Sequence, residues 1–166
     1  SASADFMNKQ GVEKALYAHV AEDGTPTFGW KTIEQNNIQF YFDFQQVEDA
    51  EDLVAGDMIS EDQADLVYTI KAIATYEGST PYYIGEIDTQ STPVDLFSES
   101  GSYYLVLNAR GSAFNFRLAG KGTGFSIHAN QHGSGSGQSG NIVYWNASAG
   151  ASQWYLRKVD YETSID

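Results

Sequence analysis

The chain has 166 residues, a length that fits one domain or at most two small ones. Its formal net charge of −13 comes from 22 acidic and 9 basic residues, and no stretch supplies the basic face that a nucleic acid or an anionic membrane requires. Cysteine is absent, which excludes disulfides, thiolate metal sites and thiol nucleophiles. Because no basic face is present, we expect no nucleic-acid binding. No apolar run is long enough to span a bilayer, so we expect no membrane insertion.

The composition favours an all-β domain. Aromatic residues, which favour strands, make up 14% of the chain. The chain has 16 glycines and 3 prolines, which indicates many tight turns. Short runs with apolar and polar residues in alternation, bounded by Gly, Ser, Thr and Asp, are typical of strands. In chain order they are 15–21, 28–33, 38–47, 66–75, 82–87, 93–97, 102–108, 113–119, 124–130, 141–145 and 153–159.

One acidic stretch interrupts this pattern. From Asp43 to Asp65 there are nine acidic residues and no basic one. Ser60 to Gln63 has the sequence of a capping box, which predicts a solvated connection with one or two helical turns. Calcium binding by the part from Glu48 to Asp65 is the alternative, but this part lacks the Asp, Asn and Gly spacing of a dedicated calcium loop.

The sequence repeats itself at a distance of 109 residues. The segment from Ser3 aligns without a gap with the segment from Ser112, and the pairs are Gly11 with Gly120, Leu16 with Phe125 and His19 with His128. After a loop of different length, Trp30 aligns with Trp145, and residues 39–42 align with residues 153–156. The two segments therefore share a strand pattern.

A weaker third copy lies between them and decides the expected fold. Its strands would be 68–73, 82–87, 93–97 and 102–107. Three four-strand repeats, at about 1–47, 64–109 and 110–160, predict a single β-trefoil domain over residues 1–166, in which six strands close a barrel and six form hairpins. A β-sandwich fits the strand spacing but gives no reason for the repeat.

The end of the last copy carries the most specific motif. Residues 141–146 read Asn-Ile-Val-Tyr-Trp-Asn, and residues 151–156 read Ala-Ser-Gln-Trp-Tyr-Leu. This resembles the ricin B-type β-trefoil lectins, whose repeats end in an aromatic-bearing strand, a short polar loop and a Gln shortly before a Trp. The resemblance implies a β-trefoil with sugar sites made by an acidic residue on the second strand, an aromatic platform on the third and an amide near the fourth.

The resemblance also assigns candidate site residues. In the last copy His128 stands at the acidic position, Trp145 is the platform with Asn146 beside it, and Ser152 stands at the amide position. The first copy offers His19 and Trp30. The second copy offers Glu86, with Asp95 or Phe97 in place of the tryptophan.

Elementary chemistry points to the same tryptophan. The C–H face of a sugar ring packs on an indole while its hydroxyls need nearby polar groups, and Trp145 has His128, Asn130, Gln131 and Asn146 close in sequence. The alternative is that Trp145 packs against its own hairpin. Trp154 alternates with Leu156 and is expected in the core. Residues 133–140 are expected to form a hairpin loop next to this site.

The sequence does not predict catalysis or a cofactor. The chain has three histidines, and no third ligand accompanies His128 and His132, so we expect no zinc site. Neither a nucleophile elbow between a strand and a helix nor a pair of carboxylates at strand ends is evident.

The functional expectation is a non-catalytic, lectin-like carbohydrate-binding module that holds a glycan or polysaccharide by aromatic stacking. Its setting would be extracellular or at the cell surface, within a larger parent protein or beside an enzyme partner. The chain begins at Ser1 without a methionine or an apolar signal segment, so we expect a mature chain or an excised domain. The alternative is a protein-interaction or protease-inhibitor-type β-trefoil with no sugar site.

Overall fold

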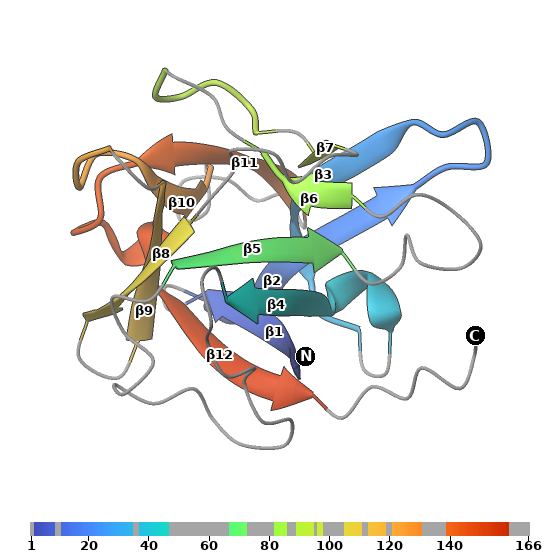
Figure 1. The fold of residues 1–166 in the computed structure, drawn as a ribbon, viewed down its shortest axis with the longest axis horizontal. Coiled ribbons are helices and arrows are strands. Elements are labelled where there is room, and N and C mark those ends of the chain that lie inside the picture. Colours follow the sequence, from blue (N-terminus) through green and yellow to red (C-terminus); the bar gives the residue numbers. More distant parts are fainter. Residues whose placement is uncertain are drawn as a thin grey trace.

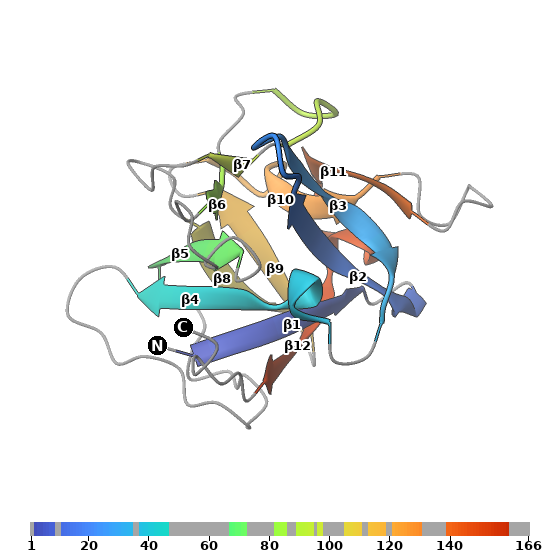
Figure 2. The same ribbon diagram turned by 90° about the vertical axis from the view of Figure 1, so that its right-hand side faces the viewer.

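The structure is a computed structural model of the chain. It describes residues 2–8, 11–34, 37–46, 67–72, 82–85, 89–94, 96–97, 105–110, 113–118, 121–130 and 139–159. These residues form twelve strands in one curled antiparallel sheet, with two short 3-10 turns and no α-helix among them (Figures 1 and 2). The expectation of an all-β chain is confirmed.

The strands are short and follow one another closely. They are β1 (Ala2–Asn8), β2 (Gly11–Val20), β3 (Pro26–Thr32), β4 (Phe42–Gln46), β5 (Val67–Ala72), β6 (Tyr82–Ile84), β7 (Leu96–Phe97), β8 (Leu105–Arg110), β9 (Ala113–Leu118), β10 (Ser126–Ala129), β11 (Ser139–Trp145) and β12 (Trp154–Val159). The 3-10 turns are η1 (Ile38–Phe40) and η4 (Gly150–Ser152).

Six of the strands pair in a cycle. β1 pairs with β4, β4 with β5, β5 with β8, β8 with β9, β9 with β12, and β12 with β1 again. The other six strands form the hairpin pairs β2–β3, β6–β7 and β10–β11. Because the cycle returns to β1, none of its six strands is left as an open sheet edge.

The core collects the apolar side chains of both groups of strands. Trp154 at the start of β12 is completely buried, and its Nε1 donates a hydrogen bond to the carbonyl of Ile127 at 3.0 Å, which confirms its predicted place in the core. Residues two apart on β10, Ile127 and Ala129, are fully buried as a strand period requires. The same cluster includes Leu16, Phe28, Phe42, Leu105, Phe116, Ile142, Tyr144 and Leu156.

The prediction of one continuous strand over 38–47 is wrong at its beginning. Ile38–Phe40 forms the turn η1, and only Phe42–Gln46 is a strand. The cause is Asn37, whose side chain accepts a hydrogen bond from the amide of Gln39 at 2.9 Å and caps the turn. Phe40 and Phe42 are both fully buried, so the turn keeps the apolar alternation that suggested a strand.

Two strand boundaries also differ from the prediction. The structure has a strand, β1, before the first predicted run, and it pairs with β12 over Ser3↔Val159 to Asn8↔Trp154. β7 covers only Leu96–Phe97 of the predicted 93–97. Residues 47–65 of the acidic stretch, with the expected helical turns, and residues 133–138 of the predicted hairpin loop lie outside the described residues. The last two residues of that predicted loop, Ser139 and Gly140, belong to β11. No described helix has the length and apolarity needed to cross a membrane.

The first and last parts of the chain have the same order of elements. Residues 2–46, the N-terminal segment, contain three strands, a 3-10 turn and a fourth strand. Residues 113–159, the C-terminal segment, contain the same series. His19 on β2 and His128 on β10 hold corresponding places in the two series.

Candidate functional site

The outer face of the β10–β11 hairpin carries the predicted tryptophan and histidine. Ser126 is paired with Trp145, and His128 is paired with Val143. Directly opposed residues of an antiparallel pair project to the same side, so these four side chains share one face. Ile127, Ala129, Ile142 and Tyr144 are on the other face, in the core.

Trp145 is accessible from solvent. Its side chain is 37% exposed, and it is the single exposed large apolar side chain among the described residues. The ring centroid of His128 lies 6.5 Å from that of Trp145, with the two rings tilted by 53°. The two residues therefore lie side by side, and the exposed indole is a surface on which an apolar ring face can pack.

His128 is held by the turn that precedes β12. Its Nδ1 is 2.8 Å from the hydroxyl of Ser152, which lies fully buried in η4. The buried side chain of Asn115 fixes this turn in place, since its Nδ2 donates to the carbonyls of Ala147 at 3.1 Å and Ser152 at 2.7 Å. The imidazole is therefore oriented by buried groups.

Asn146, next to Trp145, contacts a residue that the sequence analysis missed. The side-chain Nε2 of Gln90 donates to the carbonyl of Gly124 at 2.7 Å and lies 3.4 Å from Oδ1 of Asn146. Gln90 belongs to a segment that docks on β11, where the amide of Val94 donates to the carbonyl of Ile142 at 2.8 Å. Gln90 is 56 residues from Asn146, so no local pattern in the sequence indicates this contact.

Asn130 lies at the end of β10 and is occupied by structural contacts. Its Nδ2 donates to Oδ1 of Asn141 at 2.8 Å, and its amide donates to the carbonyl of Asn141 at 3.1 Å. Its own carbonyl accepts a hydrogen bond from Nε1 of Trp30 at 3.0 Å. Gln131, the other predicted amide, lies outside the described residues.

The hydroxyl of Ser126 lies opposite Trp145 and is another feature that the sequence analysis missed. Ser126 is fully buried, and its Oγ has no hydrogen-bond partner among the described residues.

Trp30 does not form a second platform in the N-terminal segment. It is 4% exposed and packs in the core, with its Nε1 bonded to the carbonyl of Asn130. It also lies against Gly140, where a Cβ would come within 2.7 Å of the indole nitrogen. A sugar ring cannot stack on an indole that is covered in this way.

The alignment of Trp30 with Trp145 fails by one residue. His19 is paired with Thr27, as His128 is paired with Val143. Trp145 is two residues after Val143 on β11, and Gly29 is two residues after Thr27 on β3, so Trp145 is equivalent to Gly29. Trp30 is one residue further along β3. Because successive strand residues point to opposite faces, one residue of displacement moves an indole from the surface to the core.

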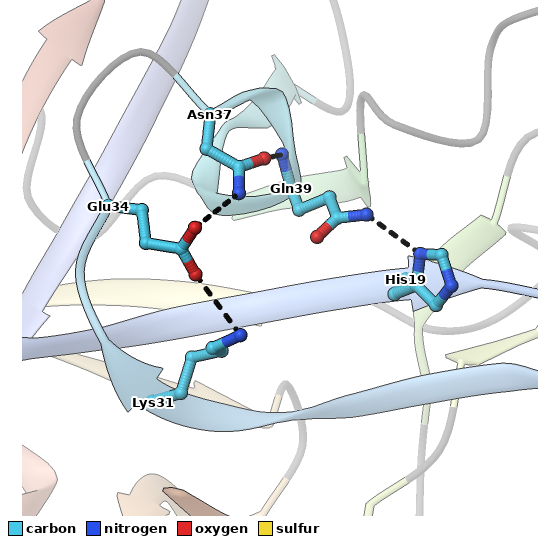
Figure 3. A network of polar contacts seen from close by, with 5 residues as sticks. All are labelled: His19, Lys31, Glu34, Asn37 and Gln39. Carbon is cyan, nitrogen blue, oxygen red and sulfur yellow. Dashed lines mark hydrogen bonds and ion pairs between the residues drawn. The ribbon is translucent and has the colours of Figure 1, made fainter. Parts of the chain in front are cut away.

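The N-terminal segment presents a tyrosine on its outer face instead. Tyr17 is paired with Gly29, just as Ser126 is paired with Trp145, so the aromatic residue comes from the opposite strand of the pair. His19 lies two residues further along β2, and its Nδ1 is 2.8 Å from Nε2 of Gln39 in η1 (Figure 3). The predicted residue His19 is thus beside Tyr17 and not beside Trp30.

The candidates of the middle copy are mostly outside the described residues. This applies to Glu86 and Asp95. Phe97 is in β7, where it pairs with Tyr83 of β6. Within the described part of the chain, no three His, Asp or Glu side chains come together as a metal site would require.

Comparisons with known proteins bear on the fold alone. No family model and no curated protein matches the sequence. One similar solved structure is a protein with unknown function from Caenorhabditis elegans, which is 15% identical, with a TM-score of 0.58 over 93% of this chain and 92% of that one. Another is the SDF2-like protein from Arabidopsis thaliana, 12% identical, with a TM-score of 0.62 over 96% of this chain and 95% of that one. At these identities the likeness shows a shared fold over nearly the whole chain.

Proposed function

We propose that the chain is a β-trefoil that binds carbohydrate without catalysis, through Trp145 on the outer face of β10–β11. The cycle of six paired strands, the three hairpin pairs and the common element order of the N- and C-terminal segments support the β-trefoil. The motif around Trp145 supports kinship with ricin B-type lectins. As a glycan-binding module it would work outside the cell, within a larger protein or beside an enzyme.

One observation carries the proposal: an exposed indole stands beside an imidazole that buried groups hold in place. Trp145 supplies an apolar ring face for the C–H groups of a sugar. His128, bonded through Nδ1 to Ser152, supplies a polar ring next to it for sugar hydroxyls. Such a site needs little reorganisation on binding, because Asn115 and η4 already position the histidine.

The test is a titration with neutral plant, mucin and bacterial polysaccharides, followed by tryptophan fluorescence and calorimetry. Trp145→Ala should abolish the saturable response, and Trp145→Phe should keep part of it because a smaller ring still stacks. Thr27→Ala is the matched control, since Thr27 is an exposed residue on the outer face of the other hairpin. This variant should bind as the wild type does.

The competing function is a protein-interaction module that uses Trp145 as an anchor. An exposed tryptophan is also a common centre of protein interfaces. If no glycan in the panel gives a response that depends on Trp145, while the protein is folded, the carbohydrate proposal is wrong and a protein partner becomes the explanation for the exposed indole.

A further inference from the structure

A second aromatic site lies on the outer face of β2–β3, and a lysine of the chain itself occupies it. The ammonium of Lys31 is 4.6 Å from the centroid of the Tyr17 ring. The same nitrogen is 3.1 Å from Oε2 of Glu34. A ring face and a carboxylate therefore hold one ammonium between them, by a cation–π contact on one side and an ion pair on the other.

The carboxylate of this site has a second contact that does not involve Lys31. Its second oxygen, Oε1 of Glu34, is 3.5 Å from Nδ2 of Asn37 (Figure 3). Asn37 is itself fixed, because its Oδ1 caps η1 by accepting from the amide of Gln39. Without the lysine, the carboxylate would keep its contact with Asn37, and the Tyr17 ring would keep its packing on Phe40, whose ring centroid is 5.5 Å away.

Lys31 is held weakly enough to be displaced. Its side chain is 34% exposed and that of Glu34 is 54% exposed, and ion pairs this open to water contribute little to stability. The lysine stem is flexible, and its ammonium is well hydrated when it turns outward. A ligand ammonium can therefore take its place at small cost.

The neighbouring groups favour a sugar as the carrier of that ammonium. The side chain of Gln39 contacts Nδ1 of His19 at 2.8 Å, so the other ring nitrogen, Nε2, is the one that can meet a ligand. In Figure 3 this second ring nitrogen points away from Gln39. It provides a polar group for a sugar hydroxyl on the face of β2 that also carries Tyr17, two residues away.

We propose that Tyr17, Glu34 and His19 form a binding site for a protonated amino sugar, which displaces Lys31 from the ring. The net charge of −13 favours a cationic glycan over a neutral or anionic one by attraction at long range. The site is separate from Trp145 and does not depend on the function proposed for that residue.

The experiment compares a fully deacetylated chitooligosaccharide with its N-acetylated counterpart by calorimetry, in mildly acidic buffer at which the sugar amines are protonated. The protein carries Trp145→Ala, so that any sugar binding at that tryptophan is removed. The deacetylated ligand should bind, and the acetylated one, which lacks the ammonium, should not. Lys31→Met should then raise the affinity about two- to fivefold, since the internal competitor is gone.

Two matched variants separate this site from general charge attraction. Lys121→Met removes the same charge in the C-terminal segment and should leave the affinity unchanged. Glu34→Gln should weaken binding, whereas Glu22→Gln, at an exposed carboxylate of the β2–β3 turn, should not. The proposal is overturned if the deacetylated ligand does not bind, if the acetylated ligand binds equally well, or if each pair of matched variants behaves alike.

Discussion

Trp30 on the β2–β3 hairpin is displaced by one residue from the position equivalent to Trp145 on the β10–β11 hairpin. This displacement places the indole of Trp30 in the core and that of Trp145 on the surface. Their exposed fractions are 4% and 37%. The displacement follows from the pairs His19↔Thr27 and His128↔Val143, which fix the counting on each hairpin. Two residues that look equivalent in the sequence therefore lie in opposite environments, one in the core and one on the surface.

This difference leads to opposite expectations for the two alanine variants. Trp30→Ala should lower the free energy of unfolding by about 3–5 kcal/mol, because it removes a buried aromatic side chain and its hydrogen bond to Asn130. Trp145→Ala should cost less, on the order of 1 kcal/mol, because 37% of this residue is already open to water in the folded state. Urea unfolding followed by circular dichroism measures both. Equal losses for the two variants would contradict the register described here.

The contact between Gly140 and Trp30 gives a sharper test of the same packing. A Cβ at residue 140 would lie 2.7–2.8 Å from three atoms of the indole, so Gly140→Ala should cost about 1–3 kcal/mol of unfolding free energy. Gly122 is the matched control, since a Cβ there meets nothing within 4 Å. Gly122→Ala should be close to neutral in the same urea titration. A neutral Gly140→Ala would mean that the indole does not rest on this glycine.

The sequence predicted the features that depend on local alternation. The all-β class, most of the strand positions and the burial of Trp154 follow from a period of two along the chain and the spacing of turn residues. An error of one or two residues at the end of a predicted strand does not change these features.

The missed features depend on register or on distant parts of the chain. The loop that joins β10 to β11 differs in length from the one that joins β2 to β3, so an alignment across them cannot resolve a shift of one residue. Because of that shift, the sequence did not indicate Tyr17 as the aromatic residue of the outer face, and Trp30 was wrongly expected on the surface. Gln90 reaches Asn146 from 56 residues away, and η1 keeps the apolar alternation of a strand, so neither leaves a local signal.

The β2–β3 turn should respond to acid through Asp23. The backbone amide of Thr25 donates to Oδ1 of Asp23 at 3.0 Å, and this bond, together with one from the Thr25 side chain, holds the pKa of the exposed carboxyl below its ordinary value. A carboxyl with a lower pKa in the folded state stabilises the fold above its unfolded-state pKa, and that contribution disappears as the pH falls through the folded-state value.

An acid titration by NMR checks this prediction. The carboxyl carbon of Asp23 should titrate below the ordinary range for aspartate, and the amide proton of Thr25 should shift with the same midpoint. In Asp23→Asn the shift of the Thr25 amide should disappear, while in Thr25→Val the carboxyl should titrate closer to its ordinary value. An ordinary midpoint in the wild type would show that the turn does not hold this hydrogen bond in solution.

Ser152 should affect recognition through His128 although it is buried below the surface. In Ser152→Ala the imidazole loses its contact at Nδ1, which is one of the contacts that orient it beside Trp145. One hydrogen bond of this kind corresponds to a loss of about two- to tenfold in the affinity for a glycan at the proposed Trp145 site. Ser148→Ala, at an exposed serine between β11 and η4, should leave the affinity as it is.

The same variant distinguishes orientation of the histidine from a general loosening of the turn. Asn115 bonds the carbonyl of Ser152 and not its hydroxyl, so η4 should keep its conformation in Ser152→Ala. The NMR signals of the Ala147 and Gln153 amides should therefore stay near their wild-type positions while the imidazole signals of His128 move. If the glycan affinity falls only when the amides of η4 also shift, Ser152 supports the turn and does not orient the histidine.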